Sequence, residues 1–148
     1  MKSQTRKVTI KSGKTVTRFT VRELTDWQTV TDSLAKMIKP GSIVTLQGPL
    51  GAGKTTLVQY LARTLGAPKR AISPTFALMR VYKTKKSKLN IARLVHVDAY
   101  RLENEKDLVV LDLDEELLEP ATIVLIEWPE MIRSWLKGKN SIKIDIQY

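Results

Sequence analysis

The chain has 148 residues, 43% hydrophobic and 27% charged, which is typical of one soluble globular domain with a buried core. No run of apolar residues approaches the roughly 20 that a membrane-spanning helix needs, and no apolar segment follows the basic N-terminus as in a signal peptide. The absence of cysteine excludes disulfides and thiolate metal sites, so we expect a cytoplasmic protein without membrane contact.

The net charge of +10 is unevenly distributed along the sequence. Residues 1–18 hold six basic and no acidic side chains, so the rest of the chain carries +4. A second basic cluster falls in an expected loop and consists of Lys83, Lys85, Lys86 and Lys88. Both clusters are either solvated or in contact with RNA or an acidic partner, and the sequence leaves this open. We divide the chain into a basic N-terminal extension, residues 1–17, and a domain, residues 18–148.

The first predicted elements are a hairpin and a helix. Residues 8–21 alternate between apolar and polar side chains around Ser12-Gly13, which indicates a β-hairpin, although the extension could also be flexible. Apolar residues at helical spacing then predict a helix whose core stripe is Trp27, Val30, Leu34, Met37 and Ile38. Thr25 and Gln28 have the spacing of a capping box, and Pro40-Gly41 ends the helix.

Residues 48–55 fit G-x-x-x-x-G-K-[ST], the phosphate-binding P-loop. A predicted buried strand at 42–47 precedes them, and a predicted helix that ends at Gly66 follows, which is the context that the motif requires. Glycines let the backbone amides curl around an anion, and the helix N-terminus adds positive charge. We assign nucleotide contacts here to Gly48, Leu50, Gly51, Ala52, Gly53, Lys54, Thr55 and Thr56.

Three side chains of the P-loop have distinct expected roles. Lys54 reaches the β- and γ-phosphates as a point charge, and Thr55 places its hydroxyl on Mg²⁺. Thr56 is placed to hydrogen-bond the α-phosphate. Farther along, Pro74 constrains a loop at residues 73–76, where Thr75 is either a sensor of the γ-phosphate or Mg²⁺ or part of a plain turn.

The second half predicts more strands and short helices. Strands at 77–82 and 89–97 form an antiparallel hairpin, and short helices follow near 103–107 and 111–118. A buried strand at 122–126, a helix at 131–136 and an alternating strand at 142–146 complete the chain. The fold class is α/β, a three-layer P-loop NTPase fold with a central mixed, mostly parallel sheet flanked by helices.

Two acids follow apolar runs, as an Mg²⁺-dependent P-loop enzyme requires. Asp98 ends one predicted strand and Glu127 ends the most apolar one. Ligand sites of open α/β sheets lie at the carboxyl ends of strands, so both acids are expected near the phosphates. His96 shares a strand face with Asp98 and is interpreted as a structural histidine rather than a catalytic base.

Four motifs in this order and spacing resemble the TsaE (YjeE) family of small bacterial ATPases, which help to make threonylcarbamoyladenosine on tRNA. They are residues 48–55, 73–76, 96–102 (His-Val-Asp-Ala-Tyr-Arg-Leu) and 126–129 (Ile-Glu-Trp-Pro), and the resemblance runs from about residue 18 to the end. The family usually has Asp where this chain has Pro49 and a bulky apolar residue where it has Ala99. Pro49 has no backbone N–H, so we expect the ring of amides around the phosphates to be altered at that position.

The resemblance implies the remaining roles. Lys54 and Thr55 hold phosphates and Mg²⁺, Asp98 and Glu127 serve the metal and the attacking water, Thr75 lies on a switch-like loop, and Trp128 lies beside the active site. The implied catalytic residues are Glu127, Lys54 and Asp98, and the implied metal ligands are Thr55, Glu127 and Asp98. ATP and Mg²⁺ are the implied cofactors and the TsaD–TsaB pair the implied partner, with tRNA contacted indirectly or through the basic N-terminus.

Two other functions compete with this hypothesis. A small-molecule kinase is the main alternative, but Arg80, Arg93 and Arg101 are scattered and no Arg-rich lid is evident. A nucleic-acid-binding module driven by the basic termini is the second. A GTPase is disfavoured because no N-K-x-D-like guanine-reading sequence is present.

Overall fold

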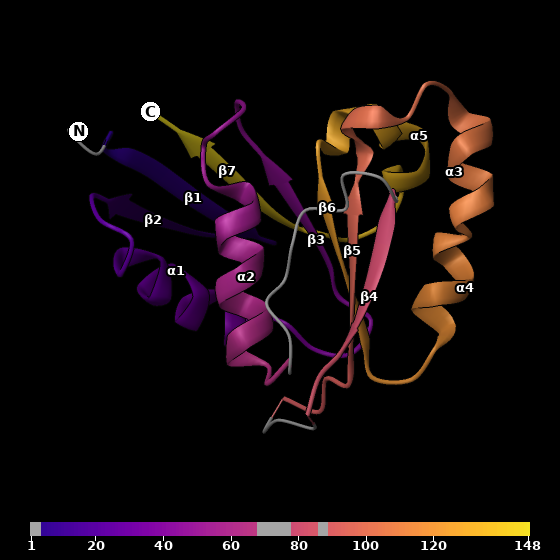
Figure 1. The fold of residues 1–148 in the computed structure, drawn as a ribbon, viewed down its shortest axis with the longest axis horizontal. Helices are drawn as coiled ribbons and strands as arrows, with labels where there is room; N and C mark the ends of the chain where they lie inside the picture. The colour runs from indigo at the N-terminus through magenta and orange to yellow at the C-terminus, as the bar shows by residue number, and fades with distance from the viewer. Residues whose placement is uncertain (1–3, 68–77, 86–88) are drawn as a thin grey trace.

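A seven-stranded sheet organises the computed structural model, which describes residues 4–67, 78–85 and 89–148 (Figure 1). The strands are β1 (Arg6–Ser12), β2 (Thr15–Val21), β3 (Ile43–Gln47), β4 (Met79–Lys83), β5 (Arg93–Asp98), β6 (Thr122–Glu127) and β7 (Ile142–Gln147). The α-helices are α1 (Asp26–Ala35), α2 (Lys54–Thr64), α3 (Glu105–Leu111), α4 (Leu113–Leu118) and α5 (Arg133–Leu136). Two 3₁₀ turns follow strand ends, η1 (Ala99–Arg101) and η2 (Pro129–Ile132).

The strand order is β2-β1-β7-β3-β6-β5-β4. The four strands β7, β3, β6 and β5 run parallel to one another, while β1 pairs antiparallel with both β7 and β2, and β4 pairs antiparallel with β5. The predicted α/β class with a mixed, mostly parallel sheet is therefore confirmed. In this arrangement β3, β5 and β6 end together: the predicted P-loop follows β3, and the predicted acids Asp98 and Glu127 are the last residues of β5 and β6.

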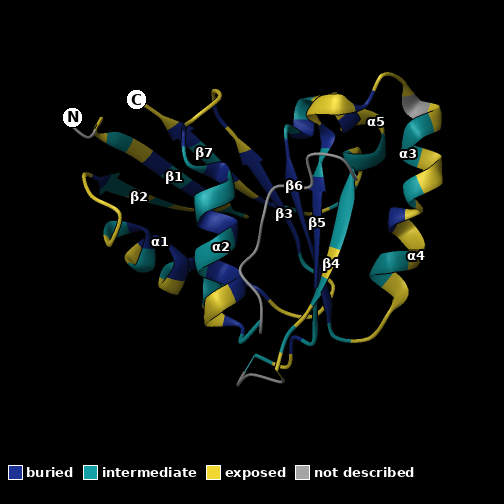
Figure 2. Cartoon of the chain, in the orientation of Figure 1, coloured by how far each residue is buried: buried dark blue, intermediate teal, exposed yellow. Residues whose placement is uncertain are grey.

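Alternating side chains of the central strands build two cores, one on each face of the sheet. On one face, Leu46 and Leu125 pack with residues of α1 and α2 such as Leu34 and Leu61. On the other face, Val124 and Ile126 pack with residues from η1, α4 and η2 and their flanks. Buried residues follow the central strands in Figure 2, while the outer surfaces of the helices are exposed. This is the predicted three-layer arrangement.

The predicted N-terminal hairpin is present as β1 and β2, and it is joined to the rest of the sheet. β1 lies between β2 and β7, and its Val8 and Ile10 are fully buried against the first core. The proposed boundary between residues 17 and 18 falls inside β2. The basic residues of the hairpin are therefore carried on an ordered strand pair.

Deleting residues 1–17 should destabilise the domain. The loss of Val8 and Ile10 alone should lower the free energy of unfolding by about 3–6 kcal/mol, since a buried aliphatic side chain contributes about 1.5–3 kcal/mol. Urea unfolding of the full chain and the truncated chain measures the difference, and deletion of residues 1–3, which precede β1, is the matched control. Equal unfolding midpoints for the full chain and the 1–17 deletion would instead favour a separable extension.

The start of α1 differs from the prediction. The Thr25 side chain makes no capping hydrogen bond. Instead, Asp26 Oδ2 accepts from the backbone amides of Arg22 at 2.8 Å and Glu23 at 3.0 Å. Gln28 points elsewhere, and its Nε2 donates to Asp32 Oδ1 at 2.8 Å. A carboxylate is a stronger acceptor than a hydroxyl, so Asp26 fixes the entry to the helix in place of the predicted capping box.

Two left-handed residues set element boundaries in the second half that differ from the predicted ones. Asn90 has φ +56°, and β5 begins only at Arg93 instead of residue 89. Asp112, with φ +47°, separates α3 from α4. Such backbone interrupts regular strands and helices, and Asn and Asp adopt it more readily than most residues.

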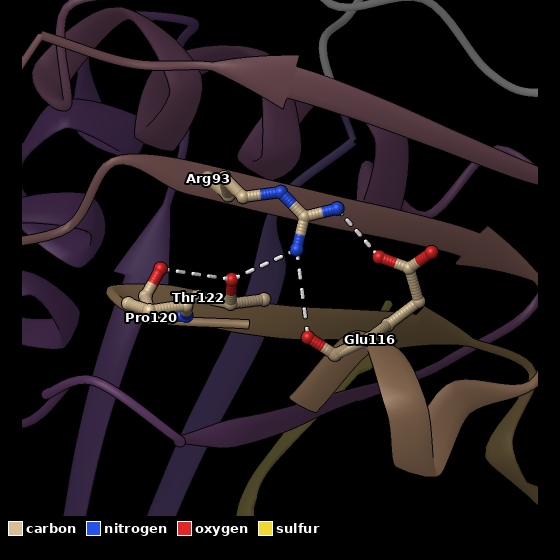
Figure 3. A network of polar contacts seen from close by, with 4 residues as sticks. All are labelled: Arg93, Glu116, Pro120 and Thr122. Carbon is tan, nitrogen blue, oxygen red and sulfur yellow. Dashed lines mark hydrogen bonds and ion pairs between the residues drawn. The ribbon is translucent and has the colours of Figure 1, made fainter. Parts of the chain in front are cut away.

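A polar network anchors α4 to the sheet (Figure 3). Arg93 on β5 donates from Nη2 to Glu116 Oε2 at 2.6 Å and from Nη1 to Thr122 Oγ1 at 3.0 Å. Both charged side chains are about one quarter exposed, so solvent screens this pair only in part. The network joins the starts of β5 and β6 to α4, at the edge of the sheet opposite the predicted site.

Candidate functional site

A cleft of about 240 Å³ lies at the carboxyl ends of β3, β5 and β6. Its lining residues are Leu50, Gly51, Gly53, Lys54, Thr55, Thr56, Asp98, Glu127 and Trp128, and every one of them is a predicted site residue. Ala52 is a loop residue whose side chain is buried in the first core, and Gly48 lies against the backbone of Ile146. Neither residue lines the cleft. Thr75 lies outside the described residues.

Two glycines give the loop its path. Gly51 has φ +76° and Gly53 has φ +114°, conformations that side chains rarely adopt. A Cβ on Gly53 would also lie 2.4 Å from the indole of Trp27. Trp27 is buried in α1, as predicted, and its indole packs against the P-loop at Gly53. This packing excludes any residue larger than glycine at position 53.

Lys54 lies at the start of α2 and is almost fully buried, with 6% of its surface exposed. Its Nζ donates to the carbonyl oxygens of Gly48 at 2.6 Å and Pro49 at 2.9 Å. It also lies 4.2 Å from the centre of the Trp128 ring, a cation–π distance. Pro49 thus contributes a carbonyl to the site although it has no amide proton to offer.

Burial lowers the pKa of Lys54 below its ordinary value, because the desolvated ammonium loses hydration. The carboxylates of Glu127, Glu130 and Asp98 oppose that shift. The Lys54 ammonium is thus poorly solvated, is hydrogen-bonded only to neutral carbonyls in the contacts described above, and faces the cleft. Because phosphate oxygens are stronger acceptors for an ammonium than neutral carbonyls are, the cleft suits an anionic ligand.

Glu127 joins the P-loop helix to the neighbouring strand. Thr55 Oγ1 donates to Glu127 Oε1 at 3.0 Å, and His96 Nε2 lies 2.8 Å from Glu127 Oε2. His96 is fully buried, and since a carboxylate oxygen only accepts, the ring donates from Nε2. Both oxygens of Glu127 are therefore held in place, and only 3% of the residue is exposed.

Asp98 and Glu127 are register partners at the ends of β5 and β6. Asp98 Oδ1 accepts from the backbone amide of Tyr100 at 3.1 Å and so begins η1. Its side chain is partly exposed in the cleft, whereas Glu127 is buried. The two acids that the sequence placed near the phosphates thus line one cleft but differ in their access to solvent.

Trp128 covers the cleft because its backbone turns sharply after β6. Its φ of +59° is left-handed, an unusual and strained conformation for a bulky residue. The ring faces Lys54 on one side and packs against Tyr100, with centroids 4.9 Å apart and planes 46° apart. Trp128 therefore lines the cleft, and Tyr100 supports its ring from outside the cleft.

The sequence prediction missed two side chains that shape the site. Arg6 donates from Nη2 to the Gly51 carbonyl at 3.2 Å, and its guanidinium lies 5.5 Å from the ring centre of Tyr148. The Tyr148 hydroxyl donates to the Leu50 carbonyl at 3.3 Å. These two residues come from opposite ends of the chain, and only the pairing of β1 with β7 brings them together. His96, in contrast, was interpreted from the sequence as a structural histidine, and its complete burial and its contact with Glu127 agree with that interpretation.

The donors in the cleft fit a hard cation with few protein ligands. No group of three or more His, Asp or Glu side chains in the described part of the chain is arranged to enclose a metal ion. Mg²⁺ does not require such a cage, since it keeps several waters and takes one or two protein oxygens with phosphate. The Thr55 hydroxyl beside a Glu127 oxygen, with Asp98 in the same cleft, offers such oxygens.

Comparison with known proteins adds an independent observation. The family model for "Threonylcarbamoyl adenosine biosynthesis protein TsaE" matches residues 21–148. A "tRNA threonylcarbamoyladenosine biosynthesis protein TsaE" from Streptomyces coelicolor is 43% identical over 114 residues, which cover 76% of this chain and 74% of the relative. The protein of the same name from Bacillus subtilis is 36% identical over 118 residues, covering 74% of this chain and 70% of that one.

A solved structure agrees with these sequence matches. The crystal structure of Bacillus subtilis YdiB is 27% identical and superposes with a TM-score of 0.65. The match covers 86% of this chain and 73% of that one. The fold predicted from the P-loop and its flanking strand and helix therefore has a solved counterpart.

Proposed function

The chain belongs to the TsaE family, and on that premise we propose that it is an Mg²⁺-dependent ATPase that takes part in threonylcarbamoyladenosine modification of tRNA. One observation carries the ATPase assignment. Thr55, the P-loop threonine, donates to the strand-end Glu127 at 3.0 Å, with Lys54 in the same cleft. This arrangement supports the proposal, because the hydroxyl and carboxylate oxygens that would bind Mg²⁺ lie in the same cleft as the ammonium that would bind phosphate.

Each side chain of the cleft has a part in the proposed reaction. Lys54 exchanges its loop carbonyls for the β- and γ-phosphate oxygens of ATP and neutralises the charge that develops during transfer. Glu127, whose orientation His96 fixes, positions the attacking water together with Asp98. Thr55, Glu127 and Asp98 would hold Mg²⁺, which when bound would neutralise phosphate charge.

We further propose the cytoplasm as the location and the TsaD–TsaB pair as the partner, with tRNA engaged mainly through that pair. In the described part of the chain, no helix is long and apolar enough to cross a membrane. Arg6 contacts the P-loop, but its Nη2 donates to a loop carbonyl, so Arg6 supports the loop and does not act as an arginine finger on the phosphates. We therefore expect a low intrinsic rate of ATP hydrolysis, which the TsaD–TsaB pair would increase.

Phosphate release from ATP by the isolated protein should be slow, should require Mg²⁺, and should rise when TsaD and TsaB are added. The measurement is steady-state phosphate production with each component alone and combined, together with a pull-down of TsaD–TsaB with and without ATP. The Lys54→Ala protein in the same mixture controls for contaminating hydrolases. Rapid transfer of phosphate to a small metabolite, with little release to water, would favour the kinase alternative.

A further inference from the structure

A polar hollow occupies the part of the sheet's second face that the second core leaves uncovered. That core packs over β5, β6 and the start of β3. Beyond it, a hollow of about 640 Å³ has β1, β7 and β3 as its floor and η2 and α5 as one wall. A second hollow of about 660 Å³ continues from it and shares Lys11, Lys139, Ser141 and Lys143. We call the two together the basic trough.

Cations dominate this trough. The first hollow is lined by Lys11, Arg18, Arg133, Lys137, Lys139 and Lys143, against only two acids, Glu130 and Asp145. Among the described residues, Lys139 is the only one of these cations with a salt bridge to a carboxylate, at 3.7 Å from Asp114 outside the trough. None of the other five cations forms a salt bridge with a described carboxylate, so the six cations outnumber the two acids of the hollow and leave it with a net positive charge.

The sheet brings two of these cations together at the floor of the trough. Lys11 on β1 and Lys143 on β7 are direct register partners, and both are exposed. Like charges directly opposite on neighbouring strands destabilise a sheet. An anion bound between them would remove that repulsion, and the neighbouring Thr9 and Thr45 would supply hydroxyl donors.

The lining favours a nucleic-acid backbone over other polyanions. Lys and Arg with Thr, Ser and Gln are the side chains that contact phosphates, whereas protein interfaces are depleted in Lys and rich in aromatic residues. Within the described part of the chain no aromatic side chain lines either hollow, so these residues offer no platform for stacking single-stranded bases. It also lacks the band of large apolar side chains that a membrane surface would need.

We propose that the basic trough binds the phosphate backbone of double-helical RNA, without reading its sequence. This contact is separate from the nucleotide cleft, which lies at the carboxyl ends of the strands and has no described lining residue in common with the trough. It rests on the proposed function only in that tRNA stems would be the natural source of such RNA. Because the trough contacts the backbone and not the bases, A+U-rich and G+C-rich duplexes should bind with equal affinity.

Binding of a labelled RNA duplex of about 16 base pairs, long enough for two successive minor grooves, tests the proposal by fluorescence anisotropy across a salt titration. The trough variant is Lys11→Gln with Lys143→Gln. Its matched control, Lys83→Gln with Lys106→Gln, loses the same charge from exposed positions on β4 and α3. At about 0.1 M salt the trough variant should bind at least tenfold more weakly, with a salt slope smaller by about two. The control should stay within about twofold of the unmodified chain.

Equal losses in both variants would overturn the proposal, because the effect would then follow net charge and not the trough. It would also fail if the trough variant bound RNA normally but lost TsaD–TsaB or vesicles of phosphatidylserine and phosphatidylcholine. ATP hydrolysis by the trough variant should equal that of the unmodified chain, which confirms its fold. If neither protein hydrolysed ATP but only the trough variant lost RNA, the proposed ATPase would fail and this inference would stand.

Discussion

Replacing Lys54 with alanine should reduce ATP turnover by at least about 10²-fold, the usual effect of removing one donor to transition-state charge. Among the described residues, Lys54 is the only lysine or arginine that lines the cleft, and its ammonium is held there by the Trp128 ring and the loop carbonyls. The fold should survive, because the hydrophobic cores on both faces of the sheet do not include this side chain.

A second substitution separates charge from packing at this position. Lys54→Met keeps a long apolar stem against Trp128 but has no ammonium to place on a phosphate. Both variants should lose turnover equally, while Lys54→Met should unfold closer to the unmodified protein in urea. Near-normal hydrolysis by either folded variant would contradict the P-loop interpretation. Full recovery of activity in Lys54→Met would show that Lys54 acts through packing.

The sequence predicted the centre of the fold well because its signals there are local. A buried strand, a Gly-rich loop and an amphipathic helix follow one another within residues 42–66, and each is specified by neighbouring residues. The two strand-end acids follow from the same logic, since parallel strands bring their carboxyl ends to one edge. For this reason eight residues predicted from the P-loop and the strand ends line one cleft, together with Trp128, which the family resemblance implied.

Features that depend on distant pairing were not predictable from these signals. Arg6 and Tyr148 support the loop at Leu50 and Gly51 only because β1 and β7 are neighbours in the sheet. The basic trough has the same origin, since Lys11 and Lys143 are 132 positions apart in sequence and opposite in register. The basic residues of β1 and β2, for which the sequence left a solvated tail and a partner contact open, therefore lie on paired strands of the sheet.

The structure also refines the roles expected of the two acids. Both oxygens of Glu127 have partners, Thr55 on one side and His96 on the other. A carboxylate held so firmly can orient a ligand or a water with little loss of entropy on binding. Asp98 is bound at one oxygen by the Tyr100 amide and is more open to the cleft, so it is better placed to contact the water shell of Mg²⁺.

Glu127→Gln should keep ATP affinity within about threefold while turnover falls by roughly 10²-fold or more, the scale of losing a general base. The amide has the same shape, so it can still accept from Thr55 or His96, but it lacks the negative charge that would activate the water. Asp98→Asn should lower the rate and also raise the Mg²⁺ concentration needed for half-maximal turnover. The measurement is ATP affinity and turnover of both variants across a Mg²⁺ titration, with Asp145→Asn on the opposite sheet face as the charge-matched control. Normal hydrolysis by Glu127→Gln would mean that its two hydrogen bonds serve the fold alone, and the proposed chemistry would then depend on Asp98.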